Sequence, residues 1–205
     1  MRRACERHRI LALFLAAACA GGLLAAPPPA AAQAGAAPAA KPVTGVRGDV
    51  LGALDDAEKK LTALAQATPA EKLSWRPATG VRSTGEVFMH VANGNYLLPT
   101  FWGAKPPAGV DRRGLEKEGA DKDKVLAALK ASFAHLRSAI AELPDQNLER
   151  QVDFFGNKVT VRQVVLQSAV HAHEHLGQSI AYARMNGIVP PWSAAEQPPP
   201  AKPGG

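Results

Sequence analysis

The stretch from Val161 to Gly187 constrains the fold of this chain more than any other. It reads VRQVVLQSAVHAHEHLGQSIAYARMNG, has the periodicity of a long helix, and carries three of the six histidines. His171 and His175 are four residues apart, and four residues advance a helix by about 400°, so both rings lie on one face, about 6 Å apart along the axis. Two imidazoles placed in this way can share one metal ion.

A third ligand must come from another part of the chain, and His90 is the best placed. It lies in the middle of a helix predicted over residues 83–98, which opens with the capping box Ser83-Thr84-Gly85-Glu86. This helix has to pack against the histidine-bearing one. We therefore predict that His90, His171 and His175 surround one divalent metal; the alternative is that they are ordinary polar histidines.

Other titratable residues have weaker arguments for a place in this centre. His173 points about 200° away from the pair and is predicted to lie on the surface or against another face. His135 lies beside an apolar stripe and is a minor alternative ligand. Glu86, one turn before His90, could orient a histidine, although its capping position already explains it. Glu86 and Glu174 are the candidates for a general base, and the catalytic residues stay unassigned.

Apolar residues recurring at spacings of three and four predict four helices and hence an all-α four-helix bundle. A small hairpin or irregular segment is expected before the last helix, around Gly156-Asn157. The segment between the second and third helices is long enough to form a wall over a site. The predicted helices span residues 49–67, 83–98, 121–143 and 161–186.

The N-terminus has the pattern of a secretory signal peptide over residues 1–34. A basic start is followed by the apolar run ILALFLAAACAGGLLAA and by the small-residue site Ala32-Gln33-Ala34. Glycines and Pro27 interrupt the apolar run, so no stable membrane span is expected. We predict an exported protein, periplasmic or secreted. Lipid attachment at Cys19 is the alternative, but the residues before it match a lipobox poorly.

Export removes both cysteines, Cys5 and Cys19, so the mature chain has neither a disulfide nor a thiol nucleophile. The first 34 residues hold four arginines and one glutamate, which leaves the mature chain only +3 of the net +6. We therefore expect no nucleic-acid partner. Residues 35–45 read as a flexible linker, residues 46–192 as the folded domain and residues 193–205 as a disordered Pro-rich tail.

Together these segments resemble the DinB-like (DinB/YfiT) superfamily of metal-binding four-helix bundles. The resemblance covers residues 46–192, and it implies that His90, His171 and His175 are the metal ligands and that Gln178 supports the site. It also implies zinc or nickel as the metal. The segments that carry it are PAEKLSWRP (Pro69–Pro77), STGEVFMH (Ser83–His90), HAHEHLGQ (His171–Gln178) and YARMNGIVPP (Tyr182–Pro191).

Three readings of the function follow from this pattern. The first is a metal-dependent hydrolase or transferase acting on a small molecule, because three histidines leave a coordination position open. The second is a non-catalytic protein that binds a metal or a small ligand, and the third is a structural bundle with a vestigial site. Some relatives transfer low-molecular-weight thiols, which are mainly intracellular and do not suit an exported chain. A homodimer stays an open alternative.

Overall fold

The computed structural model describes residues 42–193. The predicted signal peptide, Cys5 and Cys19, most of the predicted linker and the Pro-rich tail from residue 194 lie outside these residues. Within residues 42–193, no helix has the length and apolar character needed to cross a membrane.

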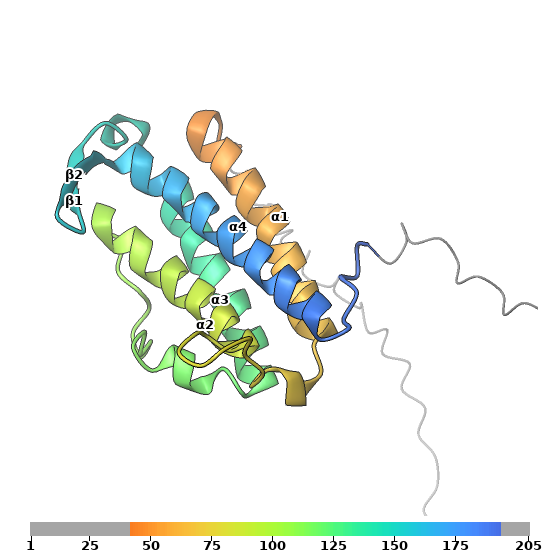
Figure 1. The fold of residues 1–205 in the computed structure, drawn as a ribbon. Coiled ribbons are helices and arrows are strands. Elements are labelled where there is room, and N and C mark those ends of the chain that lie inside the picture. Colours follow the sequence, from red (N-terminus) through yellow and green to blue (C-terminus); the bar gives the residue numbers. More distant parts are fainter. Residues whose placement is uncertain (1–41, 194–205) are drawn as a thin grey trace, which may run out of the picture. The chain divides into compact units, whose positions relative to one another are not determined.

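Four long helices form the bundle that the sequence predicts (Figure 1). Each helix packs on two neighbours, in the cyclic order α1, α4, α2, α3. The helix α2 therefore lies beside α4, which places the two histidine-bearing helices in contact. The helices are α1 (Gly45–Ala67), α2 (Thr84–Leu97), α3 (Lys122–Ala141) and α4 (Val161–Met185).

Side chains at the helix starts fix where α2, α3 and α4 begin. The predicted capping box of Ser83 and Glu86 is present at α2, and Thr160 and Gln163 form a second one at α4. The Asp121 carboxylate caps α3 by accepting from the Lys124 backbone N–H. These side chains satisfy backbone donors that the first helical turn leaves without partners. Helix α1 has no such cap and starts four residues before its predicted first residue.

The apolar stripes of the sequence become the core of the bundle. On α1 the predicted stripe is fully buried at Leu54, Leu61 and Leu64. On α3 the buried stripe starts at Val125, and the neighbouring Leu126 is only partly buried. Helix α2 is buried on almost every side, because α3, α4 and the segment after it all pack against it.

The connection from α2 to α3 returns along the length of the bundle, so these two helices run in the same direction (Figure 1). It begins with the short 3-10 helix η2 (Leu98–Trp102) and includes a second, η3 (Leu115–Glu118), which packs on α2. Because η3 passes beside the middle of α2, residues of this connection can reach His90.

A small hairpin precedes α4, as predicted. Strand β1 (Gln151–Phe154) pairs antiparallel with β2 (Asn157–Thr160), and Phe154 faces Asn157 in the register. The two residues of the turn are therefore Phe155 and Gly156, one position before the predicted Gly156-Asn157. Both have positive φ, 52° and 87°, as type I′ turns require.

Candidate metal centre

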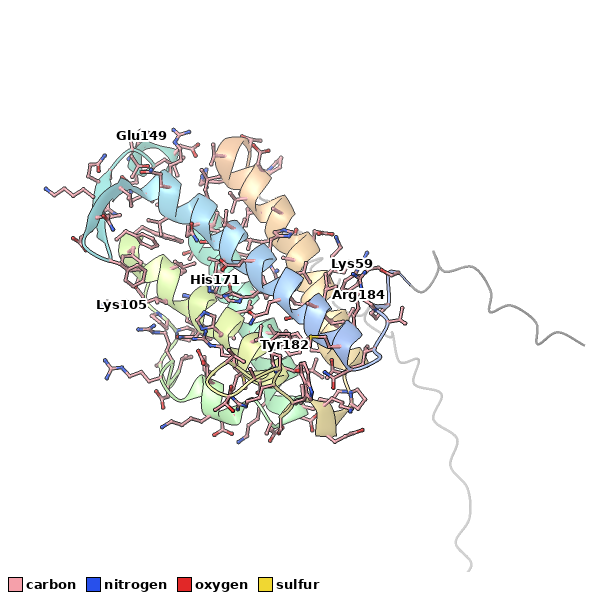
Figure 2. The ribbon with its side chains drawn as sticks, viewed as in Figure 1. Lys59, Lys105, Glu149, His171, Tyr182 and Arg184 are labelled. Atoms are coloured by element: carbon pink, nitrogen blue, oxygen red, sulfur yellow. The ribbon has the colours of Figure 1, made fainter. Side chains whose placement is uncertain are left out.

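The structure brings the three predicted histidines together. His90 comes from α2, and His171 and His175 come from adjacent turns of α4. One ligating nitrogen from each ring lies within 4.8 Å of the other two. The ring centroids are separated by 4.6 to 5.2 Å. Figure 2 shows His171 near the middle of α4, between that helix and α2.

A glycine on α2 makes room for one of these rings. A Cβ built on Gly94 would lie 2.3 Å from Cε1 and 2.7 Å from Nδ1 of His171. Ordinary carbon contacts are about 3.5–4.0 Å, so the ring fits only because this position has no side chain. Gly94 lies one turn after His90, and the two positions together form the surface of α2 against which the His171 ring lies.

The distance between two of the imidazoles suits a shared metal. Nε2 of His90 and Nε2 of His171 are 3.3 Å apart. Two nitrogens that each lie about 2.0–2.1 Å from a tetrahedral zinc ion are separated by about 3.3–3.4 Å. The chemistry of the donor set and this spacing both fit a divalent ion.

Glu116 in η3 holds the far side of the His90 ring. Its Oε1 lies 2.8 Å from His90 Nδ1, and its Oε2 accepts from Arg82 Nε at 2.9 Å. A carboxylate in this place keeps the proton on Nδ1 and leaves the Nε2 lone pair facing the other histidines. Of the two roles considered for Glu86, the structure shows the cap and not the orientation of a histidine: its carboxylate accepts from the Ser83 backbone N–H and from Arg76.

Gln178 plays the corresponding part for His175. Its Oε1 lies 2.8 Å from His175 Nδ1, while its amide nitrogen donates to the Tyr182 hydroxyl at 3.1 Å. The Tyr182 ring in turn packs edge-on against Trp75, with ring centroids 5.5 Å apart. This chain of contacts orients the amide so that its oxygen accepts, which fixes the His175 proton on Nδ1 and leaves Nε2 free.

Burial keeps two of the rings uncharged. Burial, with His175 and His90 nearby, lowers the pKa of His171 to about 3. Burial also lowers the pKa of His90, against the hydrogen bond to Glu116, which raises it. For Glu116, burial raises the pKa, but the hydrogen bonds from Arg82 and His90 outweigh it and hold that pKa below its usual value. Neutral imidazoles are the form that binds metals.

His171 differs from the other two histidines on the far side of its ring. Its Nδ1 is buried and has no hydrogen-bond partner among residues 42–193. No carboxylate or amide therefore orients this ring as Glu116 orients His90 and Gln178 orients His175.

The remaining histidines stay outside the cluster. His173 faces α1, where its Nε2 lies 3.1 Å from the Ala53 carbonyl oxygen, in agreement with the predicted direction of that ring. His135 packs against Tyr96, with ring centroids 5.4 Å apart, and does not join the centre. Glu174 is exposed on α4.

A cavity of about 330 Å³ opens beside the centre. His90 and His171 form part of its wall, together with side chains from the end of α2, from α4 and from the hairpin. Two of the three candidate ligands are therefore accessible from a space large enough for a small molecule.

Sequence reasoning missed Glu116 and the hairpin residues of the cavity. Glu116 lies 26 residues after His90, in a segment rich in glycine and charged residues whose path no periodicity fixes. The one available signal was the length of that segment, which indicated a wall over the site without saying which residue of it would face a histidine.

Comparison with known proteins places the chain in one family. A family model described as the DinB superfamily matches residues 53–179. A crystal structure of a DinB-like protein from Bacillus cereus ATCC 10987 is similar in fold, with 21% identity and a TM-score of 0.55; the match covers 69% of this chain and 93% of that one. A conserved protein from Enterococcus faecalis has 17% identity and a TM-score of 0.60, over 70% and 98% of the two chains.

No curated protein matches the chain. The family model nevertheless spans more than half of the sequence, and both structures share the four-helix fold described above. The chain belongs to the DinB superfamily.

Proposed function

We propose that His90, His171 and His175 bind one divalent ion, zinc or nickel, and that the protein is a metal-dependent hydrolase or transferase acting on a small molecule. The observation that carries this is the convergence of three imidazoles, two of which are oriented by hydrogen bonds with Glu116 and Gln178. Histidine ligands oriented by a carboxylate or an amide are the usual arrangement in metal sites.

An ion held by three protein ligands keeps a coordination position open, where it supplies Lewis acidity to a substrate oxygen or sulfur. In this proposal the protein's own residues orient the ligands and admit the substrate. Glu116 and Gln178 keep the protons of His90 and His175 on Nδ1, and the cavity beside the rings admits the substrate. A structural site would have no need of such an opening.

A second candidate function is the binding of a metal or small ligand without turnover. It is favoured by the cavity wall, which has no carboxylate among its described residues that could act as a general base. The nearest carboxylate, Glu116, is already engaged by Arg82 and His90. The candidates Glu86 and Glu174 do not line the cavity.

The metal content of protein purified without an affinity tag tests the shared part of both functions. We expect one zinc or nickel ion per chain by mass spectrometry of the metals, and one site by calorimetric titration of chelator-treated protein. A folded parent protein that binds neither ion would refute the proposal. Activity screens with and without chelator then separate an enzyme from a binding protein.

We also propose that the protein acts outside the cytoplasm, as the N-terminal pattern of residues 1–34 suggests. N-terminal sequencing of periplasmic material should give a start near residue 35. A diacylglyceryl mass on Cys19 would show a lipoprotein instead.

A further inference from the structure

We infer that the cavity beside the histidines is a substrate pocket that takes an uncharged molecule with an aromatic group, and that Phe154 and Phe155 of the hairpin hold this group. The inference rests on the proposed function only in assigning the ligand as substrate. The pocket itself belongs to the chain with or without a metal.

The volume of the cavity sets the size of the ligand. Cavities of about 150 Å³ hold a benzene ring, and small-molecule sites range upward from about 300 Å³. At about 330 Å³ this cavity accommodates one ring with a short substituent.

The wall of the cavity divides into an apolar and a polar part. Leu97, Leu98, Phe154 and Phe155 form the apolar part. The polar part consists of the two histidines and two amide side chains, Asn93 and Gln167.

No lysine, arginine, aspartate or glutamate lines this cavity in the described part of the chain. Two charged side chains contact this wall without lining the cavity. Arg112 donates to Asn93 Oδ1 at 3.5 Å and leaves the Asn93 amide N–H groups for a ligand, and the Glu116 carboxylate is engaged by His90 Nδ1 at 2.8 Å. A wall with amide donors and no charged side chain suits a neutral group such as an amide or ester, because a buried ion would have no partner there.

Phe154 and Phe155 make the apolar end of the cavity aromatic, and Phe101, which does not line the cavity, packs against both. The rings of Phe101, Phe154 and Phe155 lie 4.8 to 5.1 Å apart between centroids, in edge-to-face contact. Phe155 is nevertheless 66% exposed. Its ring is thus positioned by two others while much of its surface stays available to an incoming aromatic group.

The backbone of Phe155 gives a second, independent reason to assign it a function. Within residues 42–193 it is the one non-glycine residue with positive φ, at 52°. Asn is the residue that this turn position favours, since left-handed backbone is costly for a bulky side chain. A phenylalanine that is largely exposed recovers little of this cost by burial. Strained residues of this kind gather at ligand sites.

Nuclear magnetic resonance of purified protein, kept free of metal by a chelator, tests the inference with N-benzylacetamide. We expect this neutral aromatic amide to shift the side-chain amide signals of Asn93 and Gln167 and the backbone signal of Gly156. N-butylacetamide, which lacks the ring, should bind about 2- to 10-fold more weakly. Benzoate, which keeps the ring but is anionic, should bind more weakly than N-benzylacetamide.

Two variants identify the residue responsible. Phe155→Asn keeps a favourable turn and removes the ring, and we expect it to weaken N-benzylacetamide binding about 2- to 10-fold. Val170→Ala is the control, because Val170 is also exposed (55%) on α4 but does not line the cavity; its binding should equal that of the parent.

Each failure has its own meaning. The absence of shifts with N-benzylacetamide, or equal binding by parent and Phe155→Asn, would overturn the inference. Preference for benzoate would overturn the uncharged substrate class. Because the titration needs no metal, these results are separate from those on the proposed function. A protein that binds the amide but no zinc or nickel would refute the proposed function and leave the pocket assignment standing.

Discussion

Replacing Gly94 by alanine should separate the stability of the fold from the integrity of the metal centre. The added Cβ would lie 2.3 Å from Cε1 of His171, more than about 1 Å inside an ordinary carbon contact. The half-buried ring lies between α2 and the cavity, and it can relieve this contact only by shifting away from α2 and from its place beside His90. Metal coordination distances tolerate shifts of about 0.2 Å. Gly94→Ala should therefore lose one ligand.

The effect on stability is smaller because two contributions oppose each other. Alanine in a helix interior is favoured over glycine by about 1 kcal/mol. Forcing a methyl group into a packed interior costs about 1–3 kcal/mol. We expect the free energy of unfolding of the metal-free protein to fall by no more than about 2 kcal/mol, which leaves the protein folded. The affinity for zinc should fall by at least about 100-fold, since even loss of an orienting partner costs about 10- to 100-fold.

Gly177→Ala is the matched control. Gly177 lies in α4, two residues after His175, is exposed, and has no atom within 4 Å of a built Cβ. The free energy of unfolding of this variant should be about 1 kcal/mol higher than that of the parent, and its affinity for zinc should be unchanged. Urea unfolding and calorimetric zinc titration of both variants make the comparison. A Gly94→Ala protein that binds zinc as tightly as the parent would show that His171 is not a ligand in the position described here.

The other predictions concern individual residues of the centre and the core. His175→Ala should abolish tight zinc binding while His173→Ala leaves it unchanged, because the His173 ring faces α1; equal losses in calorimetry would contradict this assignment. Glu116→Ala should weaken zinc binding about 10- to 100-fold, and Glu116→Gln, which keeps an acceptor for His90, should weaken it less. Phe133→Asp should destabilise the fold by several kcal/mol in urea unfolding, since it buries an unpaired charge; an unchanged midpoint would remove α3 from the core. In the metal-free protein the pKa of His171 lies near 3, against 6.5 when unfolded, so the unfolded chain takes up the proton first as pH falls. Stability should therefore drop below about pH 6.5, by about 2 kcal/mol at about pH 5, and His171→Asn should flatten this pH dependence.

The fold could be predicted because its signals are local. The spacing of Leu54, Leu61 and Leu64 follows from helical geometry alone, and the capping boxes at Ser83 and Thr160 mark helix starts within three residues. The face of α4 that carries the histidine pair is fixed in the same way. These features need no knowledge of how distant segments meet.

The surroundings of the centre could not be predicted, because they depend on contacts between distant segments. Glu116 reaches His90 only because the connection from α2 to α3 returns along the bundle, which no pattern in its sequence specifies. Glu86 lies one helical turn before His90 and by spacing alone was a candidate for orienting it. Its carboxylate instead accepts from the Ser83 backbone N–H and from Arg76. The role of Phe155 depends on a turn lying one residue earlier than the sequence indicated, which places a phenylalanine in left-handed backbone.

The separation of His90 and His171 along the chain has a consequence for the entropy of the unfolded chain. They are 81 positions apart, and an ion shared between them would join α2 to α4 as a cross-link. By the chain-entropy argument used for disulfides, closing a loop of that length restricts the unfolded chain by about 4.5 kcal/mol. The cysteines at positions 5 and 19 both precede residue 42, so no thiol pair can make this connection inside the bundle. In this protein a metal bound by the imidazoles would provide the cross-link between α2 and α4, and a chelator would remove it.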